Sequence, residues 1–185
     1  MKVAYAFLFL MSNAASWVTG INLRLCSLKL QSLWSTTAAC MRARCQADAR
    51  LPPCSMIFPV GEPNTAYAKY FTGNSYLARV STGQIPFANV TFEPGCRNNW
   101  HIHKAQKGGG QMLVGVAGRG WYQEEGKPAV EILPGTVIHI PANTKHWHGA
   151  ADDSWFAHLA FEVPGEKTEN VWLEPVSDEE YSRLK

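Results

Sequence analysis

The sequence predicts an all-β fold, a sandwich or a small barrel, for residues 56–185. Two observations carry this prediction. Short runs of β-branched and aromatic residues recur from Tyr76 onward, and Gly, Pro and Asn separate them, as in Glu93-Pro-Gly95 and Pro134-Gly135. Helical patterns are scarce, so the strands do not alternate with helices as they do in α/β folds.

Nine strands and one helix follow from these patterns. The expected strands are Tyr76–Val80, Phe87–Glu93, Asn99–His103, Gln111–Ala117, Gly120–Gln123, Ala129–Leu133, Thr136–Ile140, His146–Gly149 and Trp155–Glu162. Ser177-Asp-Glu-Glu180 has the form of a capping box and predicts a short C-terminal helix. The stretch Ala66–Tyr70 can also form a short helix.

Residues 1–55 differ in charge and cysteine content from the rest of the chain. They carry six Lys or Arg against the single acid Asp48, whereas residues 56–185 carry eleven basic and fourteen acidic residues. Four of the five cysteines also lie there. We therefore expect an N-terminal extension (1–55) outside the fold and one domain (56–185).

Three origins for the extension stay open. Lys2 followed by the apolar run Val3–Met11 resembles a signal peptide, and the scarcity of acids up to Asp48 also fits an organellar transit peptide. Alternatively, Met56 is the true start. The protein is expected to be cytoplasmic if it starts near Met56, and secreted or organellar if the leader is genuine.

Composition argues against several partners. A mildly acidic domain lacks the clustered basic residues that nucleic-acid binding requires. The apolar run near the N-terminus is too short to cross a bilayer. Only Cys96 lies in the predicted domain, so no internal disulfide can form there, which suits a reducing compartment. We therefore expect no nucleic-acid or membrane partner.

Two histidine pairs stand out on predicted strands. His101 and His103 are two residues apart, and His146 and His148 repeat that spacing. Side chains alternate along a strand, so both members of a pair point to the same face. Two such pairs on facing strands would direct imidazole nitrogens at one point, a pattern that predicts a site for Zn, Fe, Mn, Ni or Co.

The same residues resemble the paired motifs of the cupin family. Gly95, His101-Ile-His103, Gln111 and Gly118 resemble the first cupin motif, and Gly135, Pro141, Asn143 and His146 resemble the second. The resemblance covers residues 95–149, and the surrounding strands extend it over most of 75–163. It implies a single-domain jelly-roll β-barrel with one divalent metal ion per chain.

The first motif departs from the usual cupin pattern. Gln111 stands where an acidic ligand is usual, and the loop Lys104–Gly110 places it farther from His103 than usual. A subgroup resembling bacterial manganese-dependent hydroxynitrile lyases does use Gln there. This resemblance implies the ligands His101, His103, Gln111 and His146, with Mn as the first choice of metal and Fe, Zn, Ni or Co as alternatives. The resemblance further implies that His148 and His158 lie near the metal and can take a proton.

Other conspicuous residues have less specific interpretations. We expect His139 to be a packing or surface residue and Cys96 to be a buried, inert thiol. Trp100, Trp147 and Trp155 could line an apolar pocket, but tryptophans on barrel strands more often belong to the core.

The resulting functional hypothesis is a metal-dependent enzyme for a small hydroxy or carbonyl compound. Cyanohydrin cleavage is the activity that the resemblance suggests, and related decarboxylation or isomerisation stays open. The alternatives are a non-catalytic cupin that binds a small ligand and an iron-dependent dioxygenase. Barrels of this kind expose strand edges that a second subunit can cover, so we expect a homodimer or a higher even oligomer.

Overall fold

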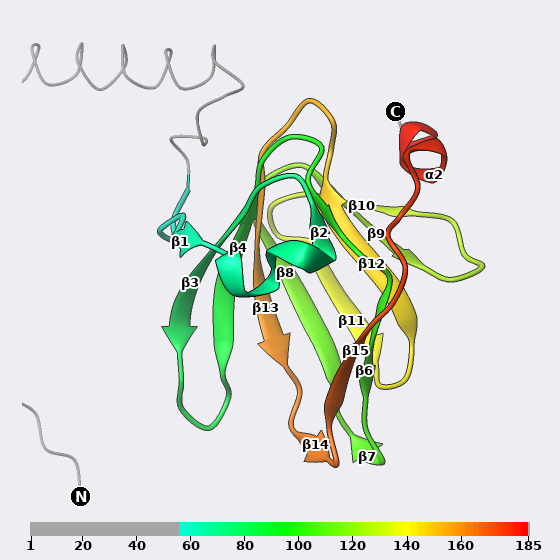
Figure 1. Cartoon of the computed structure of the whole chain (residues 1–185). Coiled ribbons are helices and arrows are strands. Elements are labelled where there is room, and N and C mark those ends of the chain that lie inside the picture. The colour runs from blue at the N-terminus through cyan, green and yellow to red at the C-terminus, as the bar shows by residue number, and fades with distance from the viewer. Residues whose placement is uncertain (1–55, 185) are drawn as a thin grey trace, which may run out of the picture. The chain divides into compact units, whose positions relative to one another are not determined.

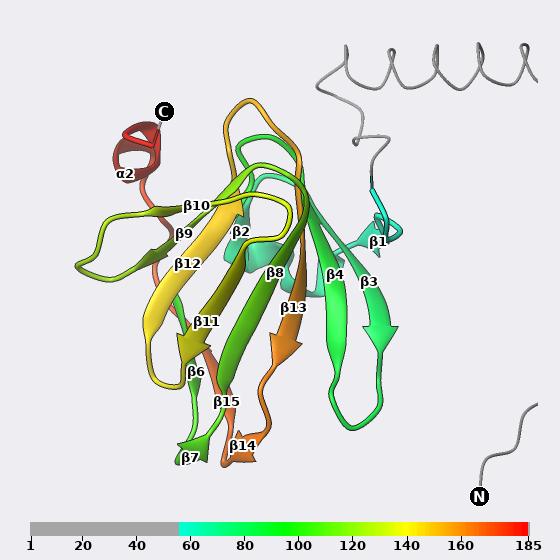
Figure 2. The ribbon, with the colours of Figure 1, turned by 180° about the vertical axis from the view of Figure 1, so that it is seen from behind.

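The computed structural model describes residues 56–184, which form two main β-sheets packed face to face. Figures 1 and 2 show the strands of the two layers from opposite sides, and among residues 56–184 they show a short α-helix near the C-terminus. The all-β jelly-roll fold predicted from the sequence is confirmed. The predicted extension, residues 1–55, lies outside the described residues.

The first sheet contains six strands, and each neighbouring pair is antiparallel. In spatial order they are β1 (Glu62–Pro63), β3 (Ser75–Ser81), β4 (Phe87–Phe92), β13 (Phe156–Glu162), β8 (Gly110–Gly118) and β11 (Val137–Pro141). All but the two-residue β1 were predicted from the sequence, with bounds that differ by only one or two residues. The long central strands β8 and β13 pair along their whole length, with a bulge between Ala157 and His158.

The second sheet brings together the strands that carry the histidine pairs. Its spatial order is β10 (Val130–Ile132), β9 (Gly120–Glu124), β12 (Lys145–Ala150), β5 (Arg97–Asn98) and β2 (Phe71–Thr72), and β6 (His101–Lys104) pairs with both β12 and β15 (Glu169–Trp172). A small third sheet pairs β7 (Lys107–Gly108) with β14 (Gly165–Glu166). The sequence did not predict β15, which places a further strand beside β6.

The apolar core fills one end of the space between the sheets. Its buried members include Phe92, Leu113, Ile140 and Phe156, all of which are fully buried. Cys96 is buried among them, and the loss of hydration raises the pKa of its thiol to about 12. The thiol is therefore protonated at neutral pH, which confirms the expectation of an inert cysteine.

Gly118 of the first motif allows the turn between β8 and β9. Its φ angle is +68°, and a Cβ atom there would lie 1.7 Å from the carbonyl oxygen of Trp155. Any other residue would be strained in φ and would also collide with the backbone. Gly118 is thus required because two segments of the chain approach closely here, and it needs no role in metal binding or catalysis.

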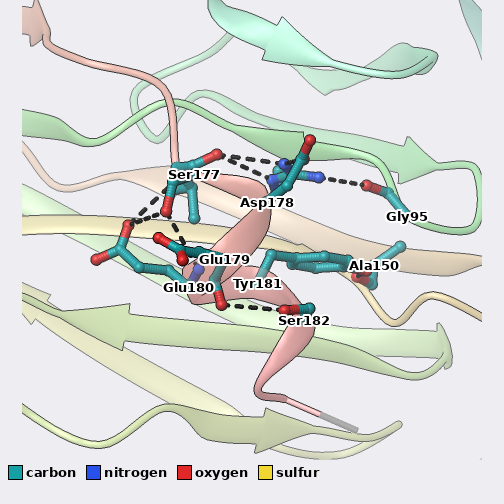
Figure 3. Close-up of polar contacts among 10 residues, drawn as sticks. Gly95, Ala150, Ser177, Asp178, Glu179, Glu180, Tyr181 and Ser182 are labelled. Carbon is teal, nitrogen blue, oxygen red and sulfur yellow. Dashed lines mark hydrogen bonds and ion pairs between the residues drawn. The ribbon is translucent and has the colours of Figure 1, made fainter.

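The C-terminal segment packs across the second sheet and ends in α2 (Asp178–Ser182). The predicted capping box is present: the Glu180 amide donates to Ser177 Oγ at 3.1 Å, and the Ser177 amide donates to the Glu180 carboxylate (Figure 3). Arg97 pairs with Asp178, and the Tyr181 hydroxyl donates to the carbonyl of Ala150 at 2.6 Å. These contacts fasten the chain end to β5 and β12.

The short helix expected near Ala66–Tyr70 forms as the 3-10 helix η1 (Thr65–Tyr70). Its last residue, Tyr70, stacks on Trp172 of β15 with ring centroids 4.7 Å apart. The segment before β3 and the strand after β14 thus meet beside β6. Among residues 56–184 there is no helix that is long and apolar enough to span a membrane.

Candidate metal centre

Three histidines converge between β6 and β12. These strands are antiparallel neighbours, and His146 lies directly opposite His101 in their register. His101, His103 and His146 are all buried, and each offers a ring nitrogen that lies within 4.8 Å of the other two. The alternation predicted from the two-residue spacing therefore holds, and it aims the imidazoles at a common point.

Backbone carbonyls orient two of these rings. The Nδ1 atom of His101 lies 2.9 Å from the carbonyl oxygen of Asn99, and Nδ1 of His146 lies 2.9 Å from that of Thr144. A carbonyl can only accept, so Nδ1 carries the proton in both rings and Nε2 keeps a lone pair. Such carbonyl contacts are typical of histidines that bind metals.

The unbonded polar atoms fit a metal ion. Nε2 of His103, Nε2 of His146 and Oε1 of Gln111 are buried and have no hydrogen-bond partner among residues 56–184. Buried polar atoms without partners are costly, and a cation would satisfy all three. Gln111 reaches this place from β8 in the opposite sheet and is itself buried.

The surroundings keep these imidazoles neutral. Burial lowers the pKa of His146 to about 4 and holds the pKa of His101 well below its ordinary value, with repulsion from the neighbouring histidines adding to the effect. The pKa of His103 is lowered less, because the Glu162 carboxylate partly offsets its burial. Neutral imidazole is the form that binds metals, so the ligands are ready at neutral pH.

His148 lies next to this centre and has a defined tautomer. Its backbone amide donates to Asn98 Oδ1 at 2.9 Å, which leaves the Asn98 amide nitrogen to donate to His148 Nε2, also at 2.9 Å. A neutral His148 therefore carries its proton on Nδ1. That atom has no acceptor among the described residues, and burial keeps the pKa of His148 well below its usual range.

His158 lies behind His148 on β13 and is fully buried. The two rings meet edge to face with centroids 4.7 Å apart, and His158 also contacts Phe92 and Phe156. Neither nitrogen of His158 has a hydrogen-bond partner within residues 56–184. Burial in this apolar setting lowers its pKa to about 3.

A cavity of about 370 Å³ opens onto the centre from the space between the sheets. His101, His103, Gln111 and His148 line it, whereas His146 and His158 do not. Part of its wall is apolar and includes Phe71, Leu77, Phe87 and Val90. The cavity therefore gives a small molecule access to the predicted ligands and to His148.

Three residues that the sequence analysis missed also shape the site. Asn98 fixes His148, Trp172 stacks on His101 with centroids 4.8 Å apart, and Asn170 donates to the Glu162 carboxylate at 3.1 Å. Trp172 and Asn170 lie on β15, downstream of both motifs, and no spacing in the sequence connects them with the histidines. Asn98 could have been suspected, since it precedes the first histidine pair by three residues.

The remaining conspicuous residues do not belong to the centre. Trp100 and Trp147 pack with Val176 in a second apolar cluster, and Trp155 is buried outside the cavity lining. The core interpretation of the tryptophans is thus confirmed. His139 is exposed on β11, as expected.

Comparison with known proteins agrees with this fold. The cupin domain family matches residues 88–160. An (R)-mandelonitrile lyase from Granulicella tundricola is 45% identical over 120 residues, covering 63% of this chain and 88% of that protein. The crystal structure of a cupin-like protein from Thermotoga maritima shares 35% identity and a TM-score of 0.60, covering 70% of this chain and 96% of the other. With its two histidine pairs on neighbouring strands of a jelly roll, this chain belongs to the cupin family.

Proposed function

We propose that this cupin is a metal-dependent lyase that cleaves cyanohydrins or related small hydroxy compounds. The observation that carries the proposal is the group of buried histidine nitrogens and the Gln111 oxygen, all without partners, beside an apolar cavity. The similarity to an (R)-mandelonitrile lyase supports it. The cavity is of a size that suits a small ligand.

His101, His103, His146 and Gln111 would hold the metal, and manganese is our first choice. All four donors are neutral, so the ion would keep its full charge and act as a Lewis acid toward a substrate oxygen. A carboxylate in place of Gln111 would neutralise part of that charge. The amide therefore fits lyase chemistry better than the usual acidic ligand does.

His158 and His148 would handle the proton. In cyanohydrin cleavage the hydroxyl loses its proton, the bond between the carbinol carbon and the nitrile carbon breaks, and cyanide leaves with a proton as hydrogen cyanide. His148 already carries a proton on Nδ1, and its Nε2 is engaged by Asn98. His158 has unengaged nitrogens but does not line the cavity, whereas His148 does. We therefore assign His148 as the donor that positions the hydroxyl oxygen, and His158 as the base that would take the proton across its contact with the His148 ring.

The cavity walls would select and shield the substrate. Phe71, Leu77, Phe87 and Val90 present apolar surface that can accept an alkyl or aryl group. Covering this part of the substrate removes water from the reacting carbon and strengthens the polar contacts on the other side. The walls thus favour a substrate with one apolar and one polar end.

The test combines metal analysis with an assay of mandelonitrile cleavage, in which the release of benzaldehyde is measured. We expect the purified protein to hold a divalent metal and to release benzaldehyde, and the double variant His101→Ala, His103→Ala to lose both properties. His139→Ala, which changes an exposed histidine, is the matched control and should behave as wild type. Equal metal content in wild type and double variant would remove the basis of the proposal. A metal-loaded wild type that cleaves no cyanohydrin would favour a non-catalytic binding protein.

A further inference from the structure

Arg79 is a charged residue on β3, in a part of the cavity wall that also contains apolar side chains. Leu77 and Arg79 lie two residues apart on β3, and both line the cavity. The alternation of strand side chains thus points the guanidinium group to the same side as the apolar wall. Arg79 is exposed, so a ligand in the cavity can reach its guanidinium group without displacing a protein partner.

No carboxylate of residues 56–184 lies within ion-pair distance of Arg79. Two other arginines, by contrast, do form ion pairs with carboxylates. Arg97 pairs with Asp178, and Arg119 pairs with Asp153 and Glu131. In the part of the chain that the structure describes, the guanidinium of Arg79 therefore keeps its donors available for a ligand.

The distribution of charged residues in the cavity lining also supports a ligand at Arg79. Arg79 and Glu162 are the only Lys, Arg, Asp or Glu residues among those that line it. Glu162 accepts a hydrogen bond from Asn170 and lies on the side of His103, whose pKa its charge raises. Glu162 thus has a hydrogen-bond partner of its own, and Arg79 is the only Lys or Arg among the residues that line the cavity.

The sheet register sets the span between Arg79 and the metal centre. Arg79 lies opposite Ala88, which lies opposite Ala160, which lies opposite Leu113, two residues from Gln111. Three strand spacings of about 4.8 Å separate these backbones, or roughly 15 Å. Arg79 and Gln111 both line the cavity, and so do Ala88 and Ala160, whose small side chains leave room between them. A molecule of a few carbon atoms can bridge the remaining gap.

We propose that Arg79 determines specificity by binding a carboxylate of the substrate. The native substrate would then be a small hydroxy or oxo acid, with its carboxylate on Arg79 and its hydroxyl or carbonyl oxygen at the histidines and Gln111. The planar guanidinium can donate two parallel hydrogen bonds to a carboxylate. The inference rests on the proposed function for the position of the reacting oxygen, and it adds the class of substrate.

The test compares acids with their neutral amides, using binding and not turnover as the readout. Mandelate and mandelamide, and lactate and lactamide, are titrated calorimetrically into the metal-loaded protein. Wild type should bind each acid more tightly than its amide. Arg79→Gln should bind the acids about 10- to 100-fold more weakly, with little change for the amides, because hydrogen bonds to charged groups are lost only with the acids. Arg79→Lys should recover part of the loss, because it restores the charge but not the fork of donors.

Arg183→Gln is the matched control. Arg183 is exposed beside α2, outside the cavity lining, and its replacement should leave all four affinities unchanged. The inference is overturned if wild type shows no preference for either acid over its amide, or if Arg79→Gln keeps that preference. A protein that shows the Arg79-dependent preference but cleaves no cyanohydrin would contradict the proposed activity and support the acid subsite.

Discussion

Hydrogen bonding separates the roles of His148 and His158. Asn98 occupies Nε2 of His148 and thereby fixes its proton on Nδ1. His158 has no polar contact among residues 56–184 and lies against two phenylalanine rings. A base must have a nitrogen lone pair that is not already engaged, and in this pair His158 meets that requirement.

Replacing His158 should separate proton transfer from metal binding. We expect His158→Leu to keep the metal content of wild type and to lower the rate of cyanohydrin cleavage about 10²- to 10⁴-fold, the usual contribution of a general base. Leucine suits the apolar surroundings, so the fold should persist. Metal analysis and a benzaldehyde assay on the same preparations provide the measurement. A variant with normal turnover would show that the base is another group.

At the scale of elements, β15 completes the centre from outside the two motifs. It pairs with β6 residue by residue, so that Trp172 lies opposite His101 and Asn170 opposite His103. Trp172 also stacks on Tyr70 of η1. One strand thus joins the segment before the barrel, the first histidine pair and the chain end that leads to α2.

Trp172 is expected to affect both stability and metal affinity. Trp172→Ala removes four ring contacts, with Tyr67, Tyr70, Phe71 and His101, which should lower the free energy of unfolding by about 1–3 kcal/mol. It also releases one face of the His101 ring, and loss of such a support should weaken metal binding about tenfold or more. Trp172→Phe keeps an aromatic face and should lose less of both. Urea unfolding and a metal titration test this, and an alanine variant with unchanged metal affinity would contradict it.

For the whole molecule, the buried histidines make the metal-free fold sensitive to acid. Burial lowers the pKa of His146 to about 4 and that of His158 to about 3, whereas unfolded histidine has a pKa near 6.5. Between these values the unfolded chain binds protons that the folded chain does not. The stability is therefore fully present above about pH 6.5 and falls as the pH drops toward the folded pKa values.

This linkage predicts the acid unfolding of protein treated with a chelator. The unfolding equilibrium constant should rise by up to about tenfold per pH unit for each such histidine as the pH falls below 6. Urea titrations at pH 7, 6 and 5 measure the slope. His158→Leu should flatten it, whereas His139→Ala should leave it unchanged, because His139 is exposed. Equal slopes for wild type and His158→Leu would show that His158 is protonated in the folded state.

The sequence by itself determined the fold class, nine of the strands and the two histidine pairs, and the family resemblance added Gln111. Alternation puts His101 and His103 on one face, and the motif glycines and prolines place the turns, so local rules sufficed. The tertiary structure decided what depends on contacts between distant segments. Gln111 meets the histidines only because β8 faces β6, and Trp172 reaches His101 only through the pairing of β15 with β6. Likewise, the tautomer of His148 and the unpaired charge of Arg79 follow from neighbours that are remote in sequence, which no spacing along the chain can specify.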